Sequence, residues 1–245
     1  MQPVPARSPQ ILEFMFGEPY RVHRLKREIV EDACAIALVG AQTFRRVELL
    51  MRGRVDAFTI AFQPGGLMAL FSIPPVELTN ADYDGGEMLG RASHELYDRL
   101  SEGPSFADRV RTADDYFLSK HPGQTHSNIV RVASRINAMD GSVRVRELAD
   151  DTGLGVRQFE RRFRDEIGIA PKLYAKIVRF EAALRRKEAS HQATWTDIAH
   201  ALGYHDQMHM VHDFKQLAGE SPSGICDQLD MFVLPEVVCG APQSL

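Results

Sequence analysis

Arginine is concentrated in one short stretch of the C-terminal half of the chain. Arg157, Arg161, Arg162 and Arg164 fall within eight residues. A guanidinium group can chelate the O6 and N7 atoms of guanine, or it can bind a phosphate in a bidentate manner. The stretch is therefore a candidate nucleic-acid contact. The alternative is a solvated helix face, on which the carboxylates at positions 160, 165 and 166 pair with the arginines.

The apolar spacing of the same stretch predicts which side chains are free. Successive residues of an α-helix are about 100° apart, so Val156, Phe159 and Phe163 should share one face. Four polar residues project broadly the other way: Arg157, Gln158, Arg161 and Arg164. Because the basic residues begin directly after a turn, at the start of the helix, we favour nucleic-acid contact over the solvated face.

A second polar stretch offers different chemistry. Its apolar residues Met210, Phe214 and Leu217 should face inward, which leaves an outward set of Gln207, Met208, His209, His212 and Lys215. Gln can bond adenine, Met can contact a thymine methyl, and His can donate to a phosphate or a base. The spacing of His205, His209 and His212 also suits a metal ion. Structural metal sites usually add Cys or carboxylate ligands in a closed pocket, so we expect no metal here.

Both stretches belong to a motif that occurs twice. The first copy runs Glu147-Leu148-Ala149, Gly153, Phe159, Phe163, Gly168, Pro171, and the second runs Asp197-Ile198-Ala199, Gly203, Met210, Phe214, Gly219, Pro222. Each copy predicts a short helix, a turn that holds a Gly, and a second amphipathic helix. This is the helix-turn-helix unit, whose second helix enters the DNA major groove.

Charge is distributed unevenly along the 245 residues. The chain carries a net charge of −4, but residues 123–226 hold 15 Lys or Arg against 13 Asp or Glu, a net +2. Three scattered cysteines give neither a disulfide framework nor a zinc pattern. The N-terminus lacks an apolar signal core, and no apolar run is long enough to cross a membrane. We therefore expect a cytoplasmic protein.

The first part of the chain is predicted to contain strands followed by helices. Short apolar runs bounded by turn residues predict strands at 11–16, 35–39, 47–51 and 57–62. Helical spacing follows at 87–100 and 105–118, and the apolar stripes of these helices could form the interface of a homodimer. We place a hinge at His121-Pro122-Gly123 and assign residues 1–122 to an N-terminal sensing or dimerisation domain.

The remainder is predicted to be helical. Helices are expected at 127–138, 145–152, 156–166, 194–202 and 206–217, with a rigid connector at 171–188 between the two helix-turn-helix units. Residues 123–226 thus form the second domain, and 227–245 form an acidic, apolar tail. The fold class is α+β: a strand-rich domain with trailing helices, then an all-α domain.

Residues 125–225 resemble the DNA-binding domain of AraC-type transcriptional regulators. The matching residues are Leu148-Ala149, Arg157, Phe159, Arg161, Phe163, Gly168, Pro171, Tyr174, Arg179, Ala183, Ile198-Ala199, Gly203-Tyr204, Asp206-Gln207, Phe214-Lys215, Gly219 and Ser221-Pro222. The resemblance implies base-reading positions at Arg157, Glu160, Arg161, Gln207, Met208 and His212. Gly155 departs from the family's Ser cap, and Met208, Met210 and His212 depart from its usual residues, so the second unit is expected to read DNA weakly or differently.

Residues 35–120 are similar to the N-terminal region of a subgroup of these regulators. The matching stretches are 38–43, 58–66 and 76–80. The resemblance implies a cut-down, cupin-like barrel followed by helices, and it assigns no effector. His23 and His94 are isolated, so each is expected to have a surface or hydrogen-bonding role.

The sequence therefore predicts a bacterial transcription factor that binds double-stranded DNA without a cofactor. Its partners would be RNA polymerase, a small-molecule effector and a second copy of the chain. One alternative is an architectural DNA-binding protein without an effector. Another is a DNA-repair enzyme with a reactive Cys, which needs a thiol of low pKa. Glu31 and Asp32 would raise the pKa of Cys34 if they lie close to it, so we expect no enzyme and no catalytic residue.

Overall fold

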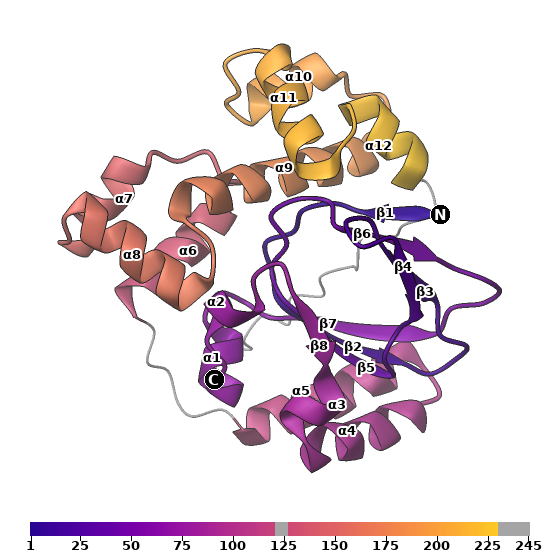
Figure 1. Ribbon diagram of the computed structural model, residues 1–245. Coiled ribbons are helices and arrows are strands. Elements are labelled where there is room, and N and C mark those ends of the chain that lie inside the picture. The colour runs from indigo at the N-terminus through magenta and orange to yellow at the C-terminus, as the bar shows by residue number, and fades with distance from the viewer. Residues whose placement is uncertain (121–126, 230–245) are drawn as a thin grey trace.

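A strand-rich N-terminal half precedes a helical C-terminal half, and the predicted α+β class is confirmed (Figure 1). A computed structural model describes residues 1–120 and 127–229. The N-terminal half contains, in chain order, β1 (Gln2–Val4), β2 (Ile11–Met15), β3 (Arg21–Arg24), β4 (Ile29–Asp32), β5 (Ile36–Val39), β6 (Val47–Leu50), β7 (Ala57–Ala61), α1 (Gly66–Phe71), α2 (Pro75–Leu78), β8 (Asp82–Asp84), α3 (Gly85–Leu89), α4 (Arg91–Ser101) and α5 (Phe106–Lys120).

The eight strands form two four-stranded sheets in which every pair is antiparallel. One sheet has the order β1-β6-β3-β4 and the other has the order β7-β2-β5-β8. The four predicted strands are β2, β5, β6 and β7. Helices α3 to α5 pack beneath the second sheet (Figure 1), where Leu96 and Leu100 join Leu12 and Phe14 in one apolar cluster. That packing stabilises the N-terminal half.

The predicted helix at 87–100 is interrupted. α3 ends and α4 begins at Gly90, whose φ of 68° and ψ of −155° are not helical. The apolar stripe of α4 is also not available as a dimer interface, because Leu96 and Leu100 are buried against the sheet. Phe106 and Leu118 of α5 are the exposed apolar side chains on this pair of helices.

The C-terminal half is all helical, as predicted. It contains α6 (Asn128–Ala138), α7 (Val145–Thr152), α8 (Val156–Ile167), α9 (Pro171–Ala189), α10 (Trp195–Ala201), α11 (Gln207–Ala218) and α12 (Pro222–Leu229). α6 to α8 form a first lobe, α10 to α12 form a second lobe, and α9 connects them (Figure 1). The predicted hinge at 121–123 lies outside the described residues, and so does the tail beyond Leu229.

Both lobes pack on α9 through aromatic side chains. Phe163 meets Tyr174 in the first lobe, and Phe214 meets Phe180 in the second, with ring centroids 5.6 and 4.7 Å apart. Three of these four rings are fully buried, and Tyr174 is nearly so. Buried aromatic pairs of this kind add to the stability gained from burial alone. The connector therefore serves as the common core of the two lobes.

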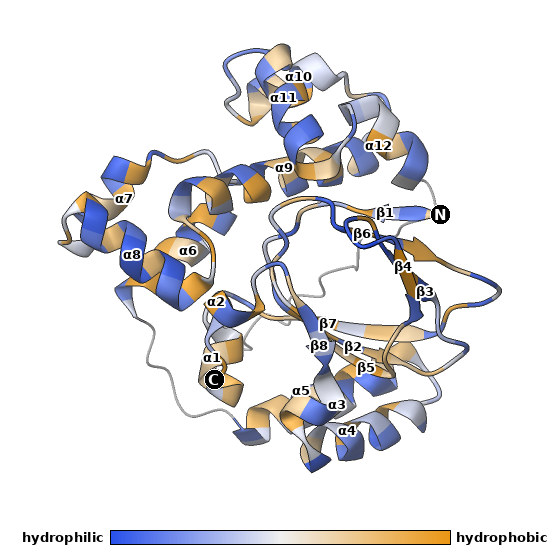
Figure 2. Ribbon diagram, in the orientation of Figure 1, coloured by the Kyte–Doolittle hydropathy of each residue, from blue (hydrophilic) through white to orange (hydrophobic). Residues whose placement is uncertain are grey.

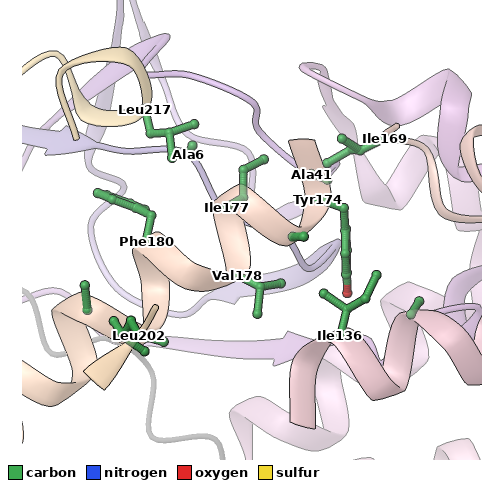
Figure 3. Close-up of a cluster of buried hydrophobic side chains, with 14 of the residues drawn as sticks. Ala6, Ala41, Ile136, Ile169, Tyr174, Ile177, Val178, Phe180, Leu202 and Leu217 are labelled. Atoms are coloured by element: carbon green, nitrogen blue, oxygen red, sulfur yellow. The ribbon is translucent and has the colours of Figure 1, made fainter. Parts of the chain in front are cut away.

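The N-terminal segment crosses into the C-terminal half. Ala6 is buried beside Leu217 and Ile177, and its N–H donates to the Leu217 carbonyl at 2.9 Å (Figure 3). Ser8 donates through its N–H and its hydroxyl to the carboxylate of Glu181 on α9, at 2.9 and 2.7 Å. We call residues 6–10 and their contacts with α9 and α11 the seam. The division at residue 122 stays a prediction, but strong contacts cross it.

Candidate nucleic-acid interface

We call the second helix of each helix-turn-helix unit, α8 and α11, its reading helix. The first of them, α8, separates its apolar and polar residues as predicted, with one exception. Phe159 and Phe163 are fully buried in the first lobe. Val156 was expected on the same face but is 41% exposed. It occupies the first turn, which projects beyond the lobe's core. The five candidate contact residues are all exposed: Arg157, Gln158, Glu160, Arg161 and Arg164.

Among the described residues, only Arg162 of the four arginines on α8 has a paired carboxylate. Arg162 donates to the Glu166 carboxylate at 2.9 and 3.1 Å, as the solvated-face alternative required. Within the described residues, Arg157, Arg161 and Arg164 form no ion pair or side-chain hydrogen bond. Free, permanently charged guanidinium groups on an exposed helix are suited to contact phosphates and guanine edges.

The N-terminus of α8 has no side-chain cap. Gly155 occupies the N-cap position with φ −64° and ψ 147°, which is an extended conformation that any residue can adopt. A side chain there would meet no atom within 4 Å. The first N–H groups of α8 are therefore open to an acceptor from outside the chain, such as a phosphate.

The second reading helix, α11, is held differently. Asp206 caps it, since its carboxylate accepts from the His209 N–H at 2.7 Å and from the His205 ring at 3.1 Å. The backbone hydrogen bond is the main cause that lowers the pKa of Asp206. Met210, Phe214 and Leu217 are fully buried, as predicted. The outward set is exposed: Gln207, Met208, His209, His212 and Lys215.

Two of these outward side chains are oriented by contacts within the lobe. The Gln207 side-chain carbonyl accepts from the Thr196 hydroxyl at 2.8 Å, which leaves the amide N–H groups as donors. The His209 ring meets the edge of Tyr204 at 5.5 Å between centroids. Met208 is 71% exposed at the start of the helix. The tip of α11 thus presents donors and an apolar group.

A buried acid on α11 escaped the sequence analysis. Asp213 is 2% exposed, and its carboxylate lies 2.7 Å from the Nζ of Lys176 on α9. Lys176 also donates to the side chain of Gln216 at 3.0 Å. Asp213 directly precedes the core residue Phe214, and that position on the inward face was the available signal.

The two reading helices belong to different lobes and lie apart from each other (Figure 1). Polar residues follow the exposed length of α8 (Figure 2). α2 packs against α8, but the Thr79 hydroxyl donates to Gly168, beyond the C-terminal end of the helix, at 2.8 Å. The N-terminal half of α8 is therefore exposed in the presence of the N-terminal domain.

The remaining candidates lie outside this interface. His23 lies 3.4 Å from the carboxylates of Glu28 and Glu48, and His94 lies 3.2 Å from the Gly90 carbonyl. Both have the hydrogen-bonding role expected. Burial, followed by the nearby Asp84, raises the pKa of the Cys34 thiol. No helix in the described ranges is long and apolar enough to span a bilayer.

Sequence comparison places the interface in a known type of domain. Residues 148–227 match the family model of a helix-turn-helix domain. An 82-residue stretch is 38% identical to an HTH-type transcriptional regulator of Mycobacterium tuberculosis, covering 34% of this chain and 31% of that protein. An 81-residue stretch is 31% identical to the HTH-type transcriptional activator RhaS of Pectobacterium atrosepticum, covering 33% and 29%. The chain thus spans about a third of the length of these curated relatives.

Structural comparison extends over nearly the whole chain. ToxT of Vibrio cholerae, in a crystal structure with bound (E)-4-(8-methylnaphthalen-1-yl)but-3-enoic acid, matches with a TM-score of 0.54 at 9% identity and covers 93% of both chains. A 1.65 Å structure of ToxT matches with a TM-score of 0.53 at 10% identity and covers 93% of this chain and 92% of that chain. Both halves of the molecule therefore share the ToxT fold.

Proposed function

Since residues 148–227 form a helix-turn-helix domain of the AraC type, we propose that the chain is a sequence-specific DNA-binding transcription regulator. The observation that carries this proposal is the exposed set of Arg157, Arg161 and Arg164 on α8, which form no ion pair with any residue that the structure describes. Arg161 is assigned to a base edge, and Arg157 and Arg164 are assigned to guanine or phosphate. The outward set on α11 supplies the second contact.

Both contacts lie on one polypeptide, so one chain can occupy two adjacent major grooves. The connector joins the two lobes that carry the reading helices, and we propose that these helices contact one face of the DNA about one helical turn, roughly 10 bp, apart. Selection of binding sites from random DNA, followed by a footprint of the full chain, tests this. Two protected segments one turn apart are expected, whereas a footprint confined to one groove segment contradicts it.

We propose further that the N-terminal domain transmits the signal of a small-molecule effector. The seam supports this, because Ser8 is bound directly to Glu181 on the connector. Burial raises the pKa of Glu181, and the hydrogen bonds from Ser8 act in the opposite direction, so the state of this buried carboxyl is coupled to residues 6–10. A movement of residues 6–10 would reach both lobes through α9.

An anionic effector would suit the interior of this domain. Burial lowers the pKa of Arg7, and its Nε has no hydrogen-bond partner in the described residues. The carboxylates of Glu13, Glu181 and Asp82 act against this shift, and a carboxylate ligand would supply a direct acceptor for the Nε group. ToxT, which shares the fold, has been crystallised with a bound carboxylic acid. A thermal-shift screen of carboxylic acids against the full chain and Arg7→Gln tests this assignment; a ligand that stabilises both equally contradicts it.

The two alternatives differ in what supports them. An architectural protein would bind DNA without changing transcription, so a transcription assay with the selected site separates it from a regulator. A repair enzyme needs a reactive thiol, and the raised pKa of Cys34 disfavours that role. The relatives are transcription regulators rather than enzymes. RNA polymerase as partner, a homodimer and a cytoplasmic location stay proposals that accompany regulation.

A further inference from the structure

The two lobes meet at the middle of the connector. Gly141, in the turn between α6 and α7, lies so close to α9 that an added Cβ would fall 2.2 Å from the Ala175 carbonyl oxygen. Gly203, in the turn between α10 and α11, approaches the first lobe, since a Cβ there would fall 2.8 Å from Ser142 Oγ. The turns of both lobes therefore converge on one point of α9.

Arg179 occupies this point and contacts both turns. Its Nη2 donates to the Gly141 carbonyl of the first lobe at 2.8 Å. Its guanidinium also lies over the ring of Tyr204 in the second lobe, 5.2 Å from the centroid. Tyr204 is 4% exposed, so the stacked ring is fixed within its lobe. One planar cation thus joins two lobes that otherwise depend on α9.

Little else joins the lobes directly. In the described residues, no helix of the first lobe packs extensively on a helix of the second. Instead an open groove of about 380 Å³ lies beside Arg179, lined by residues of both lobes such as Ser142, Arg144 and Gly203. A side chain that bridges such a gap has more influence on the angle between the lobes than one in a continuous core.

We infer that Arg179 is a positioning residue for DNA reading: it fixes the angle between the lobes, and hence the spacing at which α8 and α11 meet the DNA. Tyr204 and Gly141 are its two anchor points. Only the effect on DNA reading rests on the proposed function. The two contacts of Arg179, with Gly141 and with Tyr204, exist without DNA. A lysine cannot replace it, because an ammonium group is a point donor without a planar face.

The test in the absence of DNA measures how tightly the two lobes are held, as the width of a distance distribution between them. Spin labels are introduced through a non-natural amino acid at the exposed positions Asp150 and His200, one in each lobe, so that the native cysteines remain. We expect a narrow distance distribution in the parent chain and in Lys172→Ala, an exposed control on the same helix. Arg179→Ala should broaden the distance distribution. Arg179→Lys should give a width between those of Arg179→Ala and the parent chain. A second label pair within the first lobe, at Asp150 and Arg164, should stay narrow in every variant.

The test with DNA measures spacing. Affinity is determined for the selected site and for versions with one base pair inserted or removed between the two contacts. The parent chain and Lys172→Ala should lose about tenfold on the altered sites, because each base pair shifts the groove along and around the helix axis. Arg179→Ala should bind the selected site less tightly but lose less than about threefold on altered spacing.

Two results overturn the inference. One is an inter-lobe distribution in Arg179→Ala as narrow as in the parent chain. The other is an Arg179→Ala variant with an unchanged spacing penalty, even if it binds all sites more weakly, because that pattern shows only a loss of stability. If the parent chain selects no DNA sequence, the proposed function fails, and the label distances still decide the role of Arg179.

Discussion

The two helix-turn-helix units place their reading helices on the same scaffold but secure them in different ways. α8 begins at an uncapped Gly155 and presents unpaired guanidinium groups. α11 begins at Asp206, which caps it, and is tied to α9 by the buried Asp213. The first unit thus has permanent charge and an open N-terminus, whereas the second has a fixed position and few permanent charges. We therefore expect the first unit to supply most of the affinity for DNA, and the second unit to supply alignment and finer discrimination.

Asp213→Ala tests the fixed position of α11 and should have the largest effect. It leaves Lys176 without its buried partner, and breaking such a pair costs about 3 kcal/mol of unfolding free energy. Urea denaturation measures this loss. The matched change in the first unit, Arg162→Ala, removes a partly exposed pair and should cost under about 1 kcal/mol. Equal losses would remove the contrast between the units.

Arg161→Ala tests base reading by the first unit. We expect a loss of about 1–3 kcal/mol in binding and a relaxed preference at a single base pair, because a bidentate contact to guanine is removed. Binding to a library of single-base variants of the selected site measures both. Arg131→Ala, an exposed arginine on α6 outside the reading helix, is the control. A uniform loss on every site would assign Arg161 to phosphate instead.

Salt dependence compares the charges of the two units. Each phosphate contact that is removed should lower the slope of log affinity against log salt by about 0.9. Arg157→Ala and Arg164→Ala together should lower it more than Lys215→Ala, the one permanent cation in the outward set of α11. Titrations at several salt concentrations measure the slopes. A larger effect of Lys215 would reverse the assignment of affinity to the first unit.

The pH dependence of binding tests the histidines of the second unit. A phosphate stabilises imidazolium, so binding should take up protons and affinity should rise as pH falls. Affinity at pH about 6 and about 8, at fixed ionic strength, measures this for the parent chain and His212→Gln. If the two proteins respond to pH equally, His212 is not the titrating contact.

Gly155→Ser should have the smallest effect. A serine fits the extended backbone without a clash and would cap α8, which adds a few tenths of a kcal/mol to stability, on the order of 0.3. Thermal unfolding measures the gain, and Asp206→Gly should lower the melting temperature in the second unit. If Gly155→Ser stabilises the chain but weakens DNA binding, the open N–H groups of α8 serve as a phosphate contact.

Local patterns explain why most of the helical half could be predicted. Ser127, Thr194 and Asp206 each cap a helix with their own side chain, so those helices begin where composition placed them. The hairpin of β3 and β4 was missed because it carries charged residues on both faces, such as the paired Arg24 and Glu31, and lacks apolar alternation.

The candidate site was predicted only where it depends on neighbours along the chain. Exposure on α8 and α11 follows from helical period, and Val156 departs from it because the end of a helix can project beyond its core. Lys176–Asp213, Arg179–Gly141 and Ser8–Glu181 join residues that are far apart in sequence. No local pattern records such pairs, so only the structure could reveal them.

The seam also has a consequence for the order in which the molecule is assembled. Ser8 is made early, yet its partner Glu181 lies 173 residues later in the chain. During synthesis the first residues emerge and must wait until most of the chain has been added. Contacts of such long range form slowly, because the ends of a long loop must first be brought together. The contact of Ser8 with Glu181 can therefore form only after most of α9 has been made, and that of Ala6 with Leu217 only after α11.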